Sequence, residues 1–302
     1  MKTRELLFAA MSRRSVLEAS LGAAAATWLG APSNAGAQPA GDATAPEPTS
    51  AQVDAALPLD TYGLEHIGTV VPDVTRAATF FSSVFNPVLY KERAEPLRYY
   101  VTLDPGYIAL GSRAGETRAF IDHDCALLRT YDRVAMARRL AKDGLLAGRA
   151  GVVSDPDGLG LQMLGAPGGL AASTELAGRL VDSEPLVRPR GLAHVVHYVA
   201  DLERSAAFYR KFFGAERSEN GRVVFRAAHT SWIIERAPAG ETPRIDRVGI
   251  NAARFDAGAV ARGLEKLGAR VVSADASRLH FRSPEGLGVE LLPVDPARIW
   301  GL

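Results

Sequence analysis

The sequence contains an internal repeat, and this duplication restricts the folds open to the chain more than any other feature. A shift of 128 positions pairs identical residues near both ends of the repeat: Gly63 with Gly191, His66 with His194, Asp73 with Asp201, and Pro156 with Pro284. In the middle of the repeat the best shift is 124, which a four-residue length difference inside the repeat explains. The period is too long for a solenoid. We therefore expect two copies of one domain, at 61–168 and 191–295.

Each copy has the pattern of a mixed α and β domain. An apolar strand at 64–71 or 192–199 is followed by an aspartate, Asp73 or Asp201, which is placed to cap the first turn of a helix. Further strands and a second helix follow, and a turn with proline and glycine leads into a last strand. The unit of strand, helix and strands occurs twice per copy, so the sequence predicts an α+β fold of four such units.

The composition excludes several classes of function. Lys+Arg 35 against Asp+Glu 34 leaves a net charge of +1, which is too little for electrostatic binding to a nucleic acid. The single cysteine, Cys125, excludes internal disulfides and multi-cysteine metal sites. Beyond the N-terminus no apolar run reaches the ~18 residues of a transmembrane helix. Any metal chemistry must therefore use histidine and carboxylate ligands.

The N-terminus resembles an export signal. Arg13 and Arg14 precede a weakly apolar, alanine-rich stretch that ends in Ala35-Gly36-Ala37, which is the pattern of a twin-arginine signal peptide. We expect residues 1–37 to be this signal, so that the mature protein is periplasmic or secreted and has no stable membrane insertion. The other segments outside the repeat are interpreted as a disordered linker at 38–60, an inter-domain linker at 169–190 and a C-terminal tail at 296–302.

Three sequence blocks in the second copy resemble a known family. They are Gly191-Leu192-Ala193-His194, Asp201-Leu202-Glu203-Arg204-Ser205-Ala206-Ala207-Phe208-Tyr209, and Ser283-Pro284-Glu285-Gly286-Leu287-Gly288-Val289-Glu290-Leu291. The pattern, which the first copy shares, resembles the vicinal oxygen chelate (VOC) superfamily of glyoxalase I, methylmalonyl-CoA epimerase, bleomycin and fosfomycin resistance proteins and extradiol dioxygenases. The resemblance implies two tandem VOC domains, built from four βαβββ modules whose curled mixed sheets enclose cavities with a divalent metal.

The resemblance places one candidate metal site in the second copy. Its ligands would be His194 on the first strand, Glu290 on the last strand and Glu235 between them. His229 matches the acid–base histidine of extradiol dioxygenases, and His280 is a candidate proton donor from a late strand. Arg247 stands where a further histidine ligand is expected, and its guanidinium is able to pair with both carboxylates in the place of a cation.

A second candidate site lies in the first copy. His66 and His123 occupy histidine-ligand positions, and Gln162 replaces the glutamate of the last strand. This set carries no charged ligand unless Asp122 or Asp124 turns inward, and neutral ligands bind hard divalent ions weakly. The site in the second copy is therefore ranked ahead of the site in the first.

The candidate ligands define three hypotheses for function. Two histidines with one carboxylate suit Fe(II), which must leave positions open for O₂ and a bidentate substrate. The leading hypothesis is an exported, extradiol-dioxygenase-like enzyme that uses Fe(II) and a catechol-type substrate. The alternatives are a glyoxalase- or epimerase-type isomerase or lyase, with Ni, Co, Zn or Mn, and a metal-free protein that sequesters a small molecule. The expected partner is a small-molecule substrate, and a homodimer is compatible with the sequence.

Overall fold

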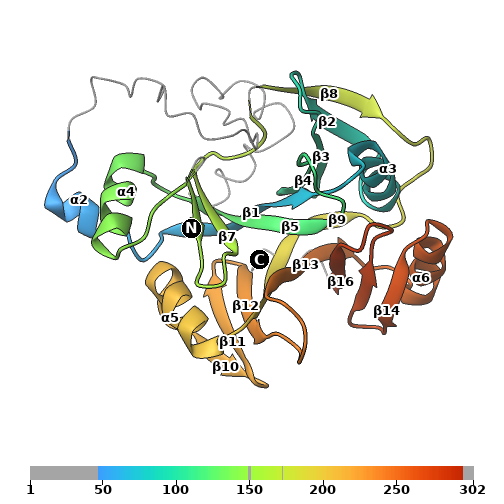
Figure 1. Ribbon diagram of the computed structural model, residues 1–302. Helices are drawn as coiled ribbons and strands as arrows, with labels where there is room; N and C mark the ends of the chain where they lie inside the picture. Colours follow the sequence, from blue (N-terminus) through green and yellow to red (C-terminus); the bar gives the residue numbers. More distant parts are fainter. Residues whose placement is uncertain (1–46, 149–150, 172, 295–302) are drawn as a thin grey trace, which may run out of the picture.

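The computed structural model describes residues 47–148, 151–171 and 173–294. They form two similar domains whose strands join in one 16-stranded mixed sheet, which curls without closing into a barrel (Figure 1). The predicted α+β class with two tandem domains is confirmed. Among these residues no helix is long and apolar enough to span a membrane. The predicted signal at 1–37 and the tail at 296–302 lie outside the described residues.

The first domain is built around two antiparallel strands, β1 and β5. β1 also pairs in parallel with β4, and β5 with β7, so each of the two strands opens one module. The elements of this domain, in chain order, are β1 (Thr61–Val70), α3 (Val74–Val84), β2 (Val88–Glu92), β3 (Tyr99–Thr102), β4 (Tyr107–Gly111), β5 (Phe120–Leu128), α4 (Arg133–Lys142), β6 (Val152–Ser154), β7 (Gly160–Gly165) and β8 (Thr174–Arg179).

The second domain repeats this arrangement around β9 and β13. These strands pair with each other antiparallel, and they pair in parallel with β12 and β16. The elements of this domain are β9 (Pro189–Val199), α5 (Leu202–Phe213), β10 (Arg217–Glu219), β11 (Arg222–Ala227), β12 (Thr230–Arg236), β13 (Arg244–Ala253), α6 (Ala257–Lys266), β14 (Arg270–Ala274), β15 (Leu279–Arg282) and β16 (Gly288–Val294).

The helices form where the sequence pattern placed them, and they pack on the sheet. Asp201 accepts a hydrogen bond from the backbone N–H of Arg204 at the start of α5, and Asp73 caps α3 in the same way. On α5, Phe208, Tyr209 and Phe212 are buried against the sheet. This amphipathic spacing anchors each helix by one apolar face.

The second module is shorter than the βαβββ unit expected of it. Within the described residues β6 and β7 are the strands that this module has after α4, since β8 pairs with β2 of the first module, whereas β14, β15 and β16 follow α6. The four residues that the first copy lacks fall between Gly144 and Pro156, whose counterparts are Gly268 and Pro284. The shorter segment lacks the length for a further hairpin strand, which explains the difference.

Two segments predicted to be linkers are ordered. The disordered linker predicted at 38–60 contains α2 (Ser50–Asp54), which lies beside α4 (Figure 1). A capping box closes the N-terminus of α2, and Leu57 and Leu59 are buried. In the segment 169–190, β8 pairs with β2 and extends the sheet. The prediction of disorder was wrong for 47–60, because composition does not reveal apolar contacts made with distant residues. The segment predicted to be the inter-domain linker contains one strand of the sheet.

Candidate functional site

A β-bulge precedes the ligand position on the first strand of every module. On β1 the extra residue in the pairing with β5 is Glu65, directly before His66. On β5 it is Asp122, directly before His123. The second domain has the same bulges, with Ala193 before His194 and Asp246 before Arg247. Because a bulge re-aims a side chain that would otherwise alternate away, each acid comes to lie beside the residue that follows it.

In the first domain two histidines face each other. The Nε2 atoms of His66 and His123 lie 3.3 Å apart. The Nδ1 atom of His66 contacts the carboxylate of Glu65, and Nδ1 of His123 lies 3.0 Å from Oδ2 of Asp122. Asp122 is itself held by the Arg113 guanidinium at 2.6 Å. Both rings are therefore fixed by a carboxylate on the side away from their shared gap.

Neighbouring residues shape the histidine pair. The ring of Tyr107 stacks on His66 with 4.7 Å between centroids. Gly68 lies directly under His123, where a Cβ atom would approach the imidazole to 2.1 Å, so only glycine lets the ring lie there. His66 is 5% exposed and the His123 side chain is 14% exposed. Solvent therefore reaches the pair mainly from the His123 side.

The hydrogen bonds fix which nitrogen carries the proton. A carboxylate partner requires a proton on each Nδ1, so each Nε2 presents its lone pair to the other. Burial lowers the pKa of His123 despite the opposing effect of Asp122, which keeps this ring neutral near pH 7. Two lone pairs this close repel each other unless a cation or a shared proton lies between them. Metal-ligating histidines typically have such a carboxylate on the second nitrogen.

Further donors lie beside the histidine pair. Pairing across β1, β5 and β7 places His66, Cys125 and Gln162 in one row. Donor atoms of Glu65, His66 and Cys125 lie within 4.8 Å of one another. Imidazole, amide and thiol donors suit ions such as Zn²⁺, Co²⁺, Ni²⁺ and Fe²⁺ better than Ca²⁺ or Mg²⁺. Metal–nitrogen bonds of about 2.1 Å also allow one ion to contact both Nε2 atoms, so these residues fit a transition-metal ion.

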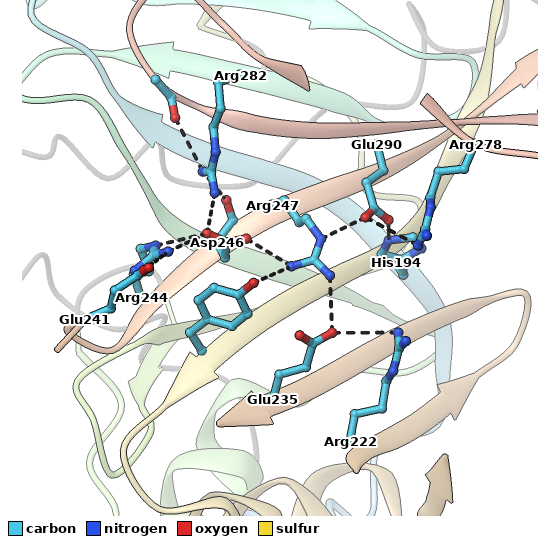
Figure 2. Close-up of polar contacts among 12 residues, drawn as sticks. His194, Arg222, Glu235, Glu241, Arg244, Asp246, Arg247, Arg278, Arg282 and Glu290 are labelled. Carbon is cyan, nitrogen blue, oxygen red and sulfur yellow. Dashed lines mark hydrogen bonds and ion pairs between the residues drawn. The ribbon is translucent and has the colours of Figure 1, made fainter. Parts of the chain in front are cut away.

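In the second domain Arg247 lies at the centre of the candidate site (Figure 2). Its Nε donates to Oε1 of Glu290 at 2.9 Å, and its Nη2 donates to Oε1 of Glu235 at 3.2 Å. Nη1 reaches Oδ2 of Asp246 at 3.0 Å. His194 Nε2 lies 2.9 Å from the second oxygen of Glu290. The structure thus brings His194, Glu235 and Glu290 together, but around a guanidinium that already supplies the positive charge. These residues do not fit a metal ion.

The charges of this cluster stabilise one another. Burial, the largest single effect on Glu290, would raise its pKa, but the hydrogen bond and charge of His194 and the charge of Arg247 outweigh it and lower the pKa to about 2. Burial would likewise lower the pKa of Arg247, but the carboxylates of Glu290 and Glu235 raise it. The cluster is therefore a buried network of permanent charges.

Acid should destabilise the protein through Glu290. Its pKa is lowered from 4.5 to about 2 in the folded state, so its stabilisation is present above pH 4.5 and is lost as the pH falls toward 2. By linkage this loss is about 3 kcal/mol in the free energy of unfolding. Urea unfolding across this range measures it. Glu290→Gln, which cannot titrate, should show a flatter pH dependence, and an unchanged dependence would contradict the assignment.

The two predicted catalytic histidines lie in different places. His229 lies in the turn between β11 and β12 with an exposed side chain, and the strand register places Ser231 rather than His229 beside His194. His280 on β15 pairs in register with Glu290. Its Nε2 atom is buried with no hydrogen-bond partner in the described part of the chain, and burial lowers its pKa. The structure thus places His280, but not His229, at the Arg247 cluster.

Sequence analysis did not identify Glu65 as a site residue. The available signal is an acid directly before each histidine, in Glu65-His66 and Asp122-His123. Strand alternation places such an acid on the face of the sheet opposite to the histidine. Only the bulge brings the acid to the side of the histidine. Of the two aspartates considered beside His123, Asp122 turns toward the site, whereas Asp124 turns toward the second domain.

The comparisons with known proteins agree with this architecture. Residues 191–291 match the sequence family described as the Glyoxalase/Bleomycin resistance protein/Dioxygenase superfamily. The match covers the second copy of the repeat. No curated protein sequence matches the chain. The VOC resemblance seen in the sequence is therefore supported directly for the second copy, and for the first copy by its repeat and its fold.

Several solved structures share the fold of both domains. The Mn(II)-bound glyoxalase from Novosphingobium aromaticivorans matches with a TM-score of 0.54 and 15% identity, over 81% of this chain and 92% of that one. A catechol 2,3-dioxygenase matches with 0.56 and 15%, over 79% and 91%. The 2,2',3-trihydroxybiphenyl 1,2-dioxygenase from Sphingomonas wittichii matches with 0.53 and 18%, over 78% and 91%. Identities this low show a common fold.

Proposed function

We propose that the chain is a metal-dependent VOC enzyme whose centre lies between His66 and His123 in the first domain. The observation that carries the proposal is the pair of Nε2 atoms 3.3 Å apart, on two rings whose Nδ1 atoms are each held by a carboxylate. At the equivalent place in the second domain, Arg247 already neutralises the carboxylates. The sequence ranks the site in the second domain first, and we now rank the site in the first domain ahead of it.

The chain's own residues would prepare this centre. Glu65 and Asp122 hold the protons on Nδ1 and so direct both Nε2 lone pairs at one point. They also supply negative charge near the ion without occupying ligand positions. Gln162 offers a neutral amide in the same row. When bound, the metal would act as a Lewis acid toward two adjacent oxygen atoms of a small substrate.

The reaction favoured first is extradiol cleavage of a catechol-type ring, because a catechol 2,3-dioxygenase and a trihydroxybiphenyl dioxygenase share the fold of both domains. One observation favours a second candidate, an isomerase or lyase of the glyoxalase type. The third donor is the amide of Gln162, whereas Fe(II) oxygenases of the two-histidine type use a carboxylate. The two reactions differ in their metal and in their need for O₂.

Metal loading separates these candidates. Folded protein is stripped with a chelator and reloaded separately with Fe(II), Mn(II), Co(II), Ni(II) or Zn(II). We expect one ion per chain and a higher melting temperature. O₂ uptake with catechol by the Fe(II) form supports the dioxygenase, and O₂-independent isomerisation of a hemithioacetal by the Ni(II) or Zn(II) form supports the isomerase. Failure of the folded chain to bind any of these ions would overturn the proposal and leave the metal-free sequestering protein.

A further inference from the structure

The two domains contact each other through ion pairs that obey the internal repeat. Arg76 at the start of α3 binds Glu285 of the second domain at 3.0 Å. Arg204 at the start of α5 binds Asp157 of the first domain at 2.8 Å. These four residues are equivalent in pairs under the repeat. The surface of the interface is therefore symmetric, which makes any asymmetry deeper in the interface informative.

One half of the buried interface is polar. Asp124 on β5 accepts a hydrogen bond from Trp232 Nε1 of the second domain at 2.6 Å. Its other oxygen lies 3.2 Å from His197 Nε2, close enough for an ion pair but without the geometry of a hydrogen bond. His197 Nδ1 lies 2.5 Å from the hydroxyl of Tyr209, which donates to Asp155 of the first domain at 3.3 Å. Asp124, His197, Tyr209 and Trp232 have no exposed surface. Together with Asp155, these four residues form what we call the Asp124 network.

The other half of the interface is uncharged at the equivalent positions. Under the repeat, Asp124 corresponds to Val248, His197 to Thr69, Tyr209 to Phe81 and Trp232 to Ile108. These four residues lie together and line one small apolar cavity between the domains. The contact between the two domains is therefore polar in one half of the interface and largely apolar in the equivalent half.

This internal comparison shows that the fold does not need the Asp124 network for packing. Burying a carboxylate costs free energy, and well-packed apolar residues of similar volume often stabilise a protein as well or better. The two halves differ in what lies beside them. Asp124 directly follows His123 of the candidate metal centre, whereas Val248 directly follows Arg247, where no metal fits. The polar half thus accompanies the strand that carries the metal-competent histidine.

We propose that Asp124 is a positioning residue, through which Trp232 and His197 of the second domain hold β5 so that His123 stays aligned with His66. This inference rests on the proposed function. Asp124 projects from the face of β5 opposite to His123, as strand alternation requires, so anchoring it fixes the tilt of the strand at this point. The second domain then serves the first as a scaffold, while its own equivalent centre is closed by Arg247.

Co(II) binding to the full chain tests this inference, since the visible spectrum of Co(II) reports ligand geometry. Trp232→Phe removes the donor to Asp124 and keeps an aromatic ring. We expect a Co(II) affinity about 10-fold to 100-fold lower, the size seen for other outer-shell partners, and a changed spectrum. Leu264→Ala, a buried truncation on α6, is the control: it should lower the melting temperature but leave the spectrum unchanged. Asp124→Asn keeps an oxygen for Trp232 and should retain most of the affinity.

A second measurement leaves the residues of the interface unchanged, so its result does not depend on the folding of the Trp232 and Asp124 variants. Trp28→Phe with Trp300→Phe leaves Trp232 as the single indole of the chain, and its N–H resonance should shift as Zn(II) is added. Failure of the unmodified chain to bind Co(II) would overturn the proposed function together with this inference. A different set of results would overturn the positioning role alone. In that case the unmodified chain binds Co(II), the Co(II) spectrum of Trp232→Phe is unchanged, and the indole resonance does not shift when Zn(II) is added.

Discussion

Replacing His66 by glutamine is expected to lower the affinity of the chain for its metal ion by more than ~100-fold. His66 supplies one of two nitrogen lone pairs directed at a single point, and loss of a direct ligand costs more than the 10-fold to 100-fold typical of outer-shell partners. In the His66→Gln variant, the increase in melting temperature that metal binding gives the unmodified chain should also disappear. Calorimetric titration of the apoprotein with Zn(II) or Co(II) measures the change.

The repeat supplies a matched control. His194 occupies the equivalent strand position in the second domain, but its Nε2 faces Glu290 rather than a second histidine. His194→Gln should leave metal affinity within about 3-fold of the unmodified chain. Equal losses in both variants would indicate a general structural effect, and a loss confined to His194→Gln would place the metal in the second domain instead.

Replacing Arg247 by methionine is expected to destabilise the protein by about 3–5 kcal/mol, the usual result of removing one partner from a buried ion pair. Glu290 and Asp246 are almost fully buried, and each accepts a hydrogen bond from this guanidinium. Without it, these carboxylates remain in the protein interior with fewer opposite charges. Urea unfolding at neutral pH measures the loss.

Arg222 provides the comparison for this second variant. It lies 3.7 Å from the same Glu235 that Arg247 contacts, but its side chain is 33% exposed. Arg222→Met should therefore cost at most about 1 kcal/mol. If Arg247→Met cost no more than Arg222→Met, the guanidinium would not be the internal cation of the second domain.

Much of the fold follows from the sequence. The repeat predicts two copies of one domain, and the aspartate caps with apolar spacing predict helices that the structure has. Even the difference between the described part of the second module and the fourth module is traceable to the four residues that the first copy lacks between Gly144 and Pro156. The ordered segments at 47–60 and 169–190 were not predictable, because their order depends on contacts with residues far along the chain.

The candidate site was predicted in part. The pairing of Arg247 with Glu235 and Glu290 follows from residue type and alignment, and the structure has these contacts. The roles of Glu65 and Asp122 depend on β-bulges, which shift strand register by one residue without a distinct sequence mark. Without the bulges, neither Glu65 nor the inward turn of Asp122 is predictable, and the first copy therefore ranks second from the sequence.

The two copies of the repeated domain arrange their buried charges differently. The second domain holds the cation inside the chain, as a guanidinium between carboxylates. The first keeps two imidazoles with open lone pairs and moves its carboxylates behind them. Buried negative charge needs a positive partner. Arg247 supplies it in the second domain and Arg113 supplies it to Asp122 in the first, and we propose that a metal ion adds to it beside the two histidines.

The location of the bound metal tests this account most directly. Crystals grown with Co(II) or Mn(II) allow the ion to be placed by its anomalous scattering. We predict one strong peak within about 2.2 Å of Nε2 of both His66 and His123, with Arg247 still on Glu290. A peak between His194 and Glu290, with the Arg247 guanidinium displaced, would contradict the central claim.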